Sequence, residues 1–137
     1  MKESGGIIMD RVARAVENHK KGYNCAQAVL CAFSDITDLT EDQLFRLSEA
    51  FGGGMGGTKG VCGAVSAMVF LAGYKNSKGI SSLPQTNKLQ SYSFAGQLMA
   101  KFEAMNKSLM CSKLKGKNLR SCDGCIEDAV KILEELI

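Results

Sequence analysis

The stretch 51–65, FGGGMGGTKGVCGAV, places seven of the chain's fifteen glycines within twelve positions and then delivers Cys62 into an apolar run. Glycine is the residue that a backbone uses for left-handed turns or close approach, and so dense a run carries an entropy cost that a simple connection does not need. We therefore expect a shaped loop ahead of a central helix. The simpler alternative is that the glycines permit close packing and that Cys62 is a small core residue.

The chain has 137 residues, and we expect a single domain over residues 1–137 that folds without covalent cross-links. Its first residues, MKESGGIIMDRV, lack the apolar middle region of a secretory signal. The longest apolar run, 61–73, is too short and too interrupted by glycine to span a membrane. We therefore expect a cytoplasmic protein. In that compartment, six cysteines indicate metal binding or catalysis rather than structural disulfides.

The charge balance argues against nucleic acid as a partner. The net charge is only +3, the chain has no tryptophan, and the lysine-rich segment 101–120 has no aromatic residue after Phe102 on which a base could stack. Glycines 52, 54 and 57 fit GxGxxG by count, but the pattern follows a helix-like segment where a dinucleotide fold requires a strand. We therefore expect neither nucleic-acid nor nucleotide binding.

Helical spacing dominates the rest of the chain. Ile8, Val12 and Ala15 share one helix face, and Asn24 and Thr40 are typical caps for the second and third helices. The sequence predicts further helices over 62–74, from about Pro84 to Phe102, and after Ser121, with loops at 75–83 and 112–120. The second of these helices has an apolar face that includes Leu89, Tyr92 and Phe102. The expected fold is an all-α bundle of five or six helices with the glycine-rich loop before a central helix.

Three thiols fall at predicted helix starts: Cys25 after Asn24, Cys62 after the glycine loop, and Cys122 after Ser121. The unpaired N–H groups and the positive dipole of a helix start favour a thiolate, which is a better nucleophile and metal ligand than a thiol. Cys122 and Cys125 form CDGC, whose spacing suits a reversible disulfide or one half of a tetrahedral thiolate site. Both could instead line the apolar face that follows.

The remaining candidates are weaker. Cys31 lies six residues after Cys25, on another side of the helix, and is expected in the core. Cys111 precedes the lysine-rich loop, where cations could hold a thiolate, or it is an exposed bystander. His19, the sole histidine, continues the apolar stripe of its helix and could be a base, a ligand or a residue at the rim of the core.

The motifs GYNCAQAVLCAF (22–33), FGGGMGG (51–57) and VCGAVSA (61–67), followed by cysteines at 111 and 122–125, resemble the C_GCAxxG_C_C family of redox-active proteins. The order of motifs matches over residues 22–137. The resemblance carries the family's cysteines onto Cys25, Cys62, Cys111 and either Cys122 or Cys125. The last glycine of the family's CGAxxG is Ala67 here, a methyl group that would crowd a close helix or cofactor contact.

Two kinds of redox chemistry are consistent with this resemblance. In the first, Cys25, Cys62, Cys122 and Cys125 exchange between dithiol and disulfide without a cofactor, serving an unidentified redox partner protein. In the second, Cys25, Cys62, Cys111 and Cys122 hold an iron-sulfur cluster. Two alternatives come from other classes: a structural zinc site with the same four ligands, and a helical interaction module whose basic segment 101–120 docks on an oxidoreductase or transporter.

Overall fold

The structure is a computed structural model that describes residues 10–137, and Ile8 of the predicted first helix lies outside these residues. The described residues form seven α-helices and no sheet, which confirms the all-α prediction. The helices are α1 (Arg11–Lys20), α2 (Cys25–Cys31), α3 (Glu41–Ser48), α4 (Gly63–Asn76), α5 (Lys88–Asn106), α6 (Cys111–Gly116) and α7 (Cys122–Leu136). Three short 3₁₀ turns accompany them: η1 (Ser34–Ile36), η2 (Glu49–Phe51) and η3 (Ile80–Ser82).

The predicted caps fix where three of these helices begin. Asn24 and Thr40 each form a capping box, in which the side chain accepts from the N3 backbone N–H and the N3 glutamine side chain accepts from the cap N–H. The Ser121 hydroxyl accepts from the N–H of Gly124 and begins α7. Each cap satisfies donors that a helix start otherwise leaves unpaired.

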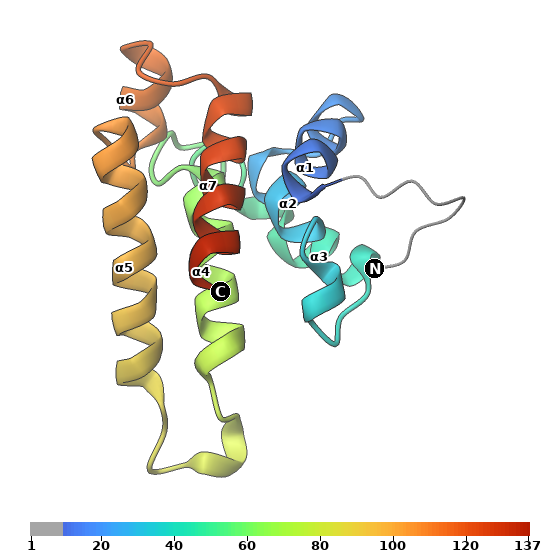
Figure 1. The fold of residues 1–137 in the computed structure, drawn as a ribbon, viewed down its shortest axis with the longest axis vertical. Coiled ribbons are helices and arrows are strands. Elements are labelled where there is room, and N and C mark those ends of the chain that lie inside the picture. Colours follow the sequence, from blue (N-terminus) through green and yellow to red (C-terminus); the bar gives the residue numbers. More distant parts are fainter. Residues whose placement is uncertain (1–9) are drawn as a thin grey trace.

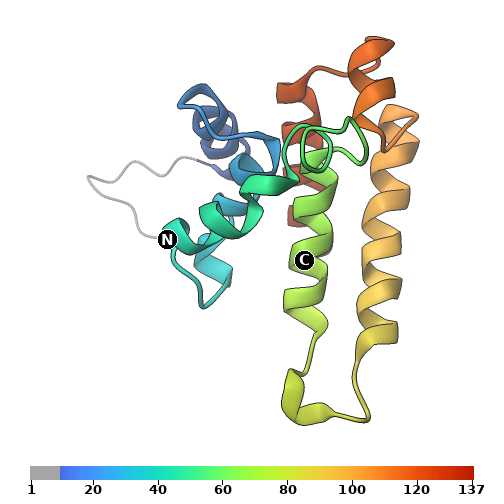
Figure 2. The ribbon, with the colours of Figure 1, turned by 180° about the vertical axis from the view of Figure 1, so that it is seen from behind.

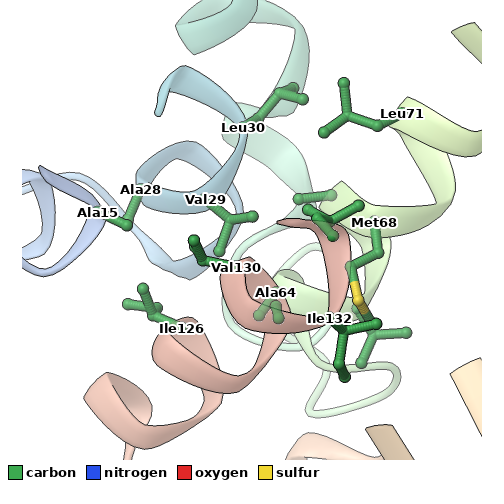
Figure 3. Close-up of a cluster of buried hydrophobic side chains, with 14 of the residues drawn as sticks. Ala15, Ala28, Val29, Leu30, Ala64, Met68, Leu71, Ile126, Val130 and Ile132 are labelled. Carbon is green, nitrogen blue, oxygen red and sulfur yellow. The ribbon is translucent and has the colours of Figure 1, made fainter. Parts of the chain in front are cut away.

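The long helices α4, α5 and α7 run beside one another, and α1 to α3 pack along one side of this group (Figure 1). The glycine loop and α6 lie together at the end of the bundle where α4 and α7 begin, as the reverse view also shows (Figure 2). The core joins α1, α2, α4 and α7, with buried residues that include Ala15, Ala28, Val29, Ala64 and Val130 (Figure 3). The small residues among them let helix backbones approach closely.

The glycine loop turns on left-handed backbone conformations, with φ of +63° at Gly53, +75° at Gly54 and +73° at Gly57. It is tied to α6 by backbone hydrogen bonds from the Cys111 N–H to the Gly60 carbonyl (2.6 Å) and from the Cys62 N–H to the Leu109 carbonyl (2.8 Å). The loop therefore sets where α4 begins, which confirms its predicted place ahead of a central helix.

The structure corrects three details of the sequence analysis. Residues 112–120 were predicted as loop, but α6 occupies their first half because Leu114 is wholly buried and anchors a helical turn. The long helix α5 begins at Lys88 rather than near Pro84. Leu89 and Tyr92, expected on its core face, are 70% and 65% exposed, and Figure 1 shows that α7 ends before it reaches the first turns of α5, where α4 alone runs beside them.

Ala67 is fully buried within the core, so its methyl group is accommodated by the packing around α4. None of the helices in the described part of the chain combines the length and the hydropathy that crossing a bilayer requires.

The left-handed turn at Gly54 should be intolerant of a side chain. A Cβ there would lie 2.6 Å from the Cα of Lys59 and 2.8 Å from the Cβ of Cys111, whereas a Cβ at Gly57 would meet nothing within 4 Å. We expect Gly57→Ala to lower the free energy of unfolding by about 1–2 kcal/mol through the backbone conformation alone. Gly54→Ala has the same backbone effect and also forces a methyl group against Lys59 and Cys111, so we expect it to lower the free energy of unfolding by about 3 kcal/mol or more.

Urea denaturation of the two variants measures this difference. Equal losses of stability for the two would show that the loop does not pack against Lys59 and Cys111 as described.

Candidate functional site

Four thiols meet where three helices begin. Cys25 is the first residue of α2, Cys62 is the N-cap of α4, and Cys122 and Cys125 lie in the first turn of α7. All four sulfurs interact electrostatically with the ammonium group of Lys115, which reaches them from α6. Cys62 and Cys125 are buried, while Cys25 and Cys122 are half-buried and form the more accessible side of this thiol cluster.

Gly63 makes the meeting of α2 and α4 sterically feasible. A Cβ at this position would lie 3.1 Å from the backbone nitrogen of Ala26 and 3.4 Å from the Cβ of Cys25. The first contact is with backbone, which cannot rotate away, so a side chain at this position would push the two helix starts apart by a few tenths of an ångström. The glycine after Cys62 thus places Cys62 beside Cys25.

Cys62 and Cys125 form a hydrogen-bonded pair with opposite pKa shifts. The hydrogen-bonding interaction of Cys62 with Cys125 is the largest cause that lowers the pKa of Cys62 to about 6, against an opposing effect of burial. The backbone N–H groups of Ala64 and Val65 lower it further, although no cap hydrogen bond of standard geometry forms. The same bond to Cys62, followed by burial, raises the pKa of Cys125.

Lys115 supplies the positive charge of the cluster. Its Nζ lies 3.5 Å from the Cys125 sulfur and also donates to the backbone carbonyl of Arg120 (3.4 Å). The positive charge lowers the pKa of Cys25, Cys62 and Cys125 alike, although in Cys25 and Cys125 other effects prevail. Lys115 lies seven residues before Cys122, and no short-range pattern links it to the four sulfurs, because residues 112–120 were interpreted as loop.

Cys25 corrects the prediction that a helix start favours the thiolate. Its pKa is raised, first by burial and then by the negative charges of Cys122 and Cys62, and its thiol donates a hydrogen bond to the Cys122 sulfur. The desolvation of a sulfur within the cluster outweighs the dipole of the short helix α2. The two cysteines of CDGC therefore face different partners: Cys122 faces Cys25, and Cys125 faces Cys62.

His19, at the end of α1, reaches the half-buried side of the cluster. Its Nδ1 lies 2.7 Å from a carboxylate oxygen of Asp123, the residue that follows Cys122. A ring nitrogen of His19 and the sulfurs of Cys25 and Cys122 all lie within 4.8 Å of one another. The sequence analysis named His19 as a possible ligand, but the contact with Asp123 spans 104 positions and left no pattern in the sequence.

The other two cysteines lie elsewhere. Cys31 is buried in the core, as predicted; its thiol donates to the Glu41 carbonyl (3.7 Å), and burial raises its pKa to about 12. Cys111 begins α6 and lies against Gly54 of the glycine loop. It is not among the groups that interact with Lys115 or with the four clustered sulfurs of the described chain.

A hollow of about 630 Å³ lies away from this cluster, between α1, α4 and the end of α7. It is lined by Arg11, Phe33, Leu71, Tyr74 and other residues, and no thiol borders it. The charged group in its wall already has partners, since Arg11 lies over the ring of Phe33 and forms an ion pair with Asp35. The thiol cluster, not this hollow, contains the redox-capable groups.

A family model described as "Putative redox-active protein (C_GCAxxG_C_C)" matches residues 23–136. The match covers most of the chain, so the chain belongs to the C_GCAxxG_C_C family, as the motifs indicated. No curated protein and no solved structure matches the chain.

Removal of the Lys115 charge should raise the pKa of Cys62. With a pKa of about 6, Cys62 is largely thiolate at pH 7, and Lys115→Gln should raise that pKa and reduce the thiolate fraction near pH 6 because a stabilising cation is lost. Lys113→Gln, an exposed position on the same helix, is the matched control and should have little effect.

The ultraviolet absorbance of the thiolate, followed against pH and corrected with a Cys62→Ser variant, reports the titration. An unchanged midpoint in Lys115→Gln, or a wild-type midpoint in the ordinary thiol range, would contradict this electrostatic assignment.

Proposed function

We propose that this protein exchanges electrons with a partner disulfide through the pair Cys62 and Cys125. The observation that carries the proposal is the meeting of two buried thiols, Cys62 at the start of α4 and Cys125 in the first turn of α7, whose interaction lowers the pKa of Cys62 and raises that of Cys125. One member is thus prepared as a nucleophile and the other is held as a thiol in reserve. Membership of the C_GCAxxG_C_C family supports redox activity in general.

The proposed reaction begins when the Cys62 thiolate attacks one sulfur of the partner disulfide. A mixed disulfide forms, and the other partner sulfur leaves as a thiolate. Cys125 then gives up its proton to that leaving thiolate and attacks the Cys62 sulfur. This attack breaks the mixed disulfide, and the partner sulfur that was bound to Cys62 leaves as a thiolate that takes a proton from solvent. The products are a Cys62–Cys125 disulfide and a reduced partner, so two electrons have passed to the partner; the reverse sequence reduces this protein.

Lys115 has a defined part in the second step. Cys125 must become a thiolate before it can attack, and the ammonium 3.5 Å from its sulfur stabilises that charge as it develops. Access is from the side of Cys25 and Cys122, because these residues are half-buried whereas Cys62 is only 2% exposed. The partner is therefore a flexible peptide segment or a small disulfide rather than a flat protein surface.

An iron-sulfur cluster is the second candidate, supported by the gathering of four sulfurs around one cation. Four thiolates are the usual complement for such a cluster, and Lys115 would offset part of their negative charge. The ligand set expected from the sequence included Cys111, but the four sulfurs around Lys115 include Cys125 and not Cys111. The set would be Cys25, Cys62, Cys122 and Cys125.

The dithiol reaction predicts one specific bond. Treatment of the metal-free protein with oxidised glutathione should give a Cys62–Cys125 disulfide, identified by peptide mapping without reduction. In Cys125→Ser the reaction should stop at a glutathione adduct on Cys62, about one per chain, because the resolving thiol is absent. Cys31→Ala should behave as wild type. A dominant Cys122–Cys125 or Cys25–Cys122 bond would exclude this assignment.

The cluster candidate predicts a coloured protein. Anaerobic purification should then yield iron and sulfide together with visible absorption that reductant bleaches, and Cys125→Ser should abolish it while Cys111→Ser does not. Loss of colour in Cys111→Ser alone would restore the ligand set expected from the sequence. A colourless protein without sulfide would leave dithiol exchange as the function.

A further inference from the structure

The half-buried side of the thiol cluster contains residues that take no part in the proposed dithiol exchange. His19 from α1, Cys25 from α2 and Cys122 from α7 bring one nitrogen and two sulfurs within 4.8 Å of one another. Three ligand atoms from three different helices converge here. The pair Cys62 and Cys125, which suffices for the disulfide chemistry, lies on the buried side.

We propose that His19, Cys25 and Cys122 bind a zinc ion through one imidazole and two thiolates, with the fourth coordination position open. This site goes beyond the dithiol reaction and does not depend on it. It also differs from the structural zinc site considered in the sequence analysis, which would have four thiolates and no open position.

The spacing of the three atoms fits a metal. Zinc bonds of about 2.3 Å to sulfur and 2.0–2.1 Å to nitrogen in a tetrahedral arrangement place ligand atoms about 3.7 Å apart. The observed upper limit of 4.8 Å requires each atom to move by no more than about 1 Å. Side-chain rotation at the half-exposed ends of three helices provides a movement of this size.

The chemistry of the donors selects the metal. Thiolate and imidazole together favour zinc or cuprous copper and disfavour magnesium, calcium and manganese, which prefer oxygen ligands. Three protein ligands of the Cys₂His type, with one position left for a water or substrate, are the pattern of reactive rather than structural zinc sites. The ion would be reached from solvent, since the side chain of His19 is 31% exposed.

The contact of Asp123 with His19 also supports the zinc site. A carboxylate can only accept, so the Nδ1 of His19, 2.7 Å from Asp123, carries the proton and donates it. Nε2 is then the unprotonated nitrogen that a metal requires. A carboxylate behind a ligand histidine fixes the tautomer and the ring orientation and increases the basicity of the ligand. Asp123 is thus a positioning residue, and its place inside CDGC ties it to Cys122.

Zinc binding has a consequence for the protons of the site. Because zinc binds the thiolate form of cysteine, each thiol that enters the site must release its proton, and the ion neutralises the negative charge of the two sulfurs.

The test is a thiol-protection map of the wild-type chain. Reduced, metal-free protein is given one equivalent of Zn²⁺ under anaerobic conditions, then alkylated and analysed by mass spectrometry. Cys25 and Cys122 should become protected, while Cys62 and Cys125 keep their reactivity and still form a disulfide with oxidised glutathione. Protection of all four sulfurs, or of none, would overturn the proposal.

Variants test the roles of the nitrogen and the carboxylate. Competition with a chelating indicator should show that Asp123→Asn weakens zinc binding by about 10–100-fold. His19→Ala should weaken it at least as much, with the helical circular dichroism unchanged. Cys111→Ser and Cys31→Ala are matched controls with no change in affinity. Unchanged affinity in His19→Ala would overturn the site, and the protection map remains decisive if that variant does not fold.

The two proposals fail separately. Absence of zinc protection with a normal Cys62–Cys125 disulfide would exclude the zinc site and leave the dithiol function intact. Zinc protection of Cys25 and Cys122 without that disulfide would do the opposite.

Discussion

The close approach of α4 to α2 at Gly63 is the constraint on which the rest of the site depends. A single methyl group at Gly63 would lie 3.1 Å from the backbone nitrogen of Ala26, and the two helix starts would have to separate by a few tenths of an ångström. Cys62 and Cys25 lie at these helix starts, and Cys62 and Cys125 belong to the core that α2, α4 and α7 share, so the spacing of the sulfurs depends on this contact. The glycine loop also holds the site together. The Leu109 carbonyl accepts from the Cys62 N–H, and the Gly60 carbonyl accepts from the N–H of Cys111 at the start of α6, the helix that carries Lys115.

Burial and hydrogen bonding compete at every sulfur of the cluster, and their balance decides which one is ionised. Cys25 and Cys62 both lie at helix starts, but only Cys62 receives a thiol hydrogen bond together with two backbone N–H groups, and only its pKa falls. One pKa unit corresponds to about 1.4 kcal/mol. A second buried thiolate beside the first would therefore cost free energy, because all four sulfurs share the positive charge of Lys115. The cluster therefore favours one thiolate at a time unless a metal or a disulfide removes the negative charge.

Local signals in the sequence were sufficient for most of the fold and for half of the site. Asn24, Thr40 and Ser121 act over three residues, so the helices they begin could be predicted, and so could the thiols beside them. The pairing of Cys62 with Cys125 and of His19 with Asp123 depends on how helices far apart in sequence are packed, and no short-range pattern records it. The helix α6 was missed for the same reason, because a six-residue segment is stabilised by the burial of Leu114 rather than by its own propensity.

The packing of the helices, rather than the spacing of the two cysteines, decides which partners the CDGC motif contacts. Residues three apart on a helix share a side, but at the junction of α2, α4 and α7 that side meets two different neighbours. Cys122 and Asp123 face the half-buried group with Cys25 and His19, and Cys125 faces Cys62. A metal that holds Cys122 would also fix the first turn of α7 and hence the distance between Cys125 and Cys62. By thermodynamic reciprocity, the oxidation state of that inner pair would influence the affinity for the metal to the same extent. One helical turn is thus the element through which two kinds of sulfur chemistry in a small bundle can be coupled.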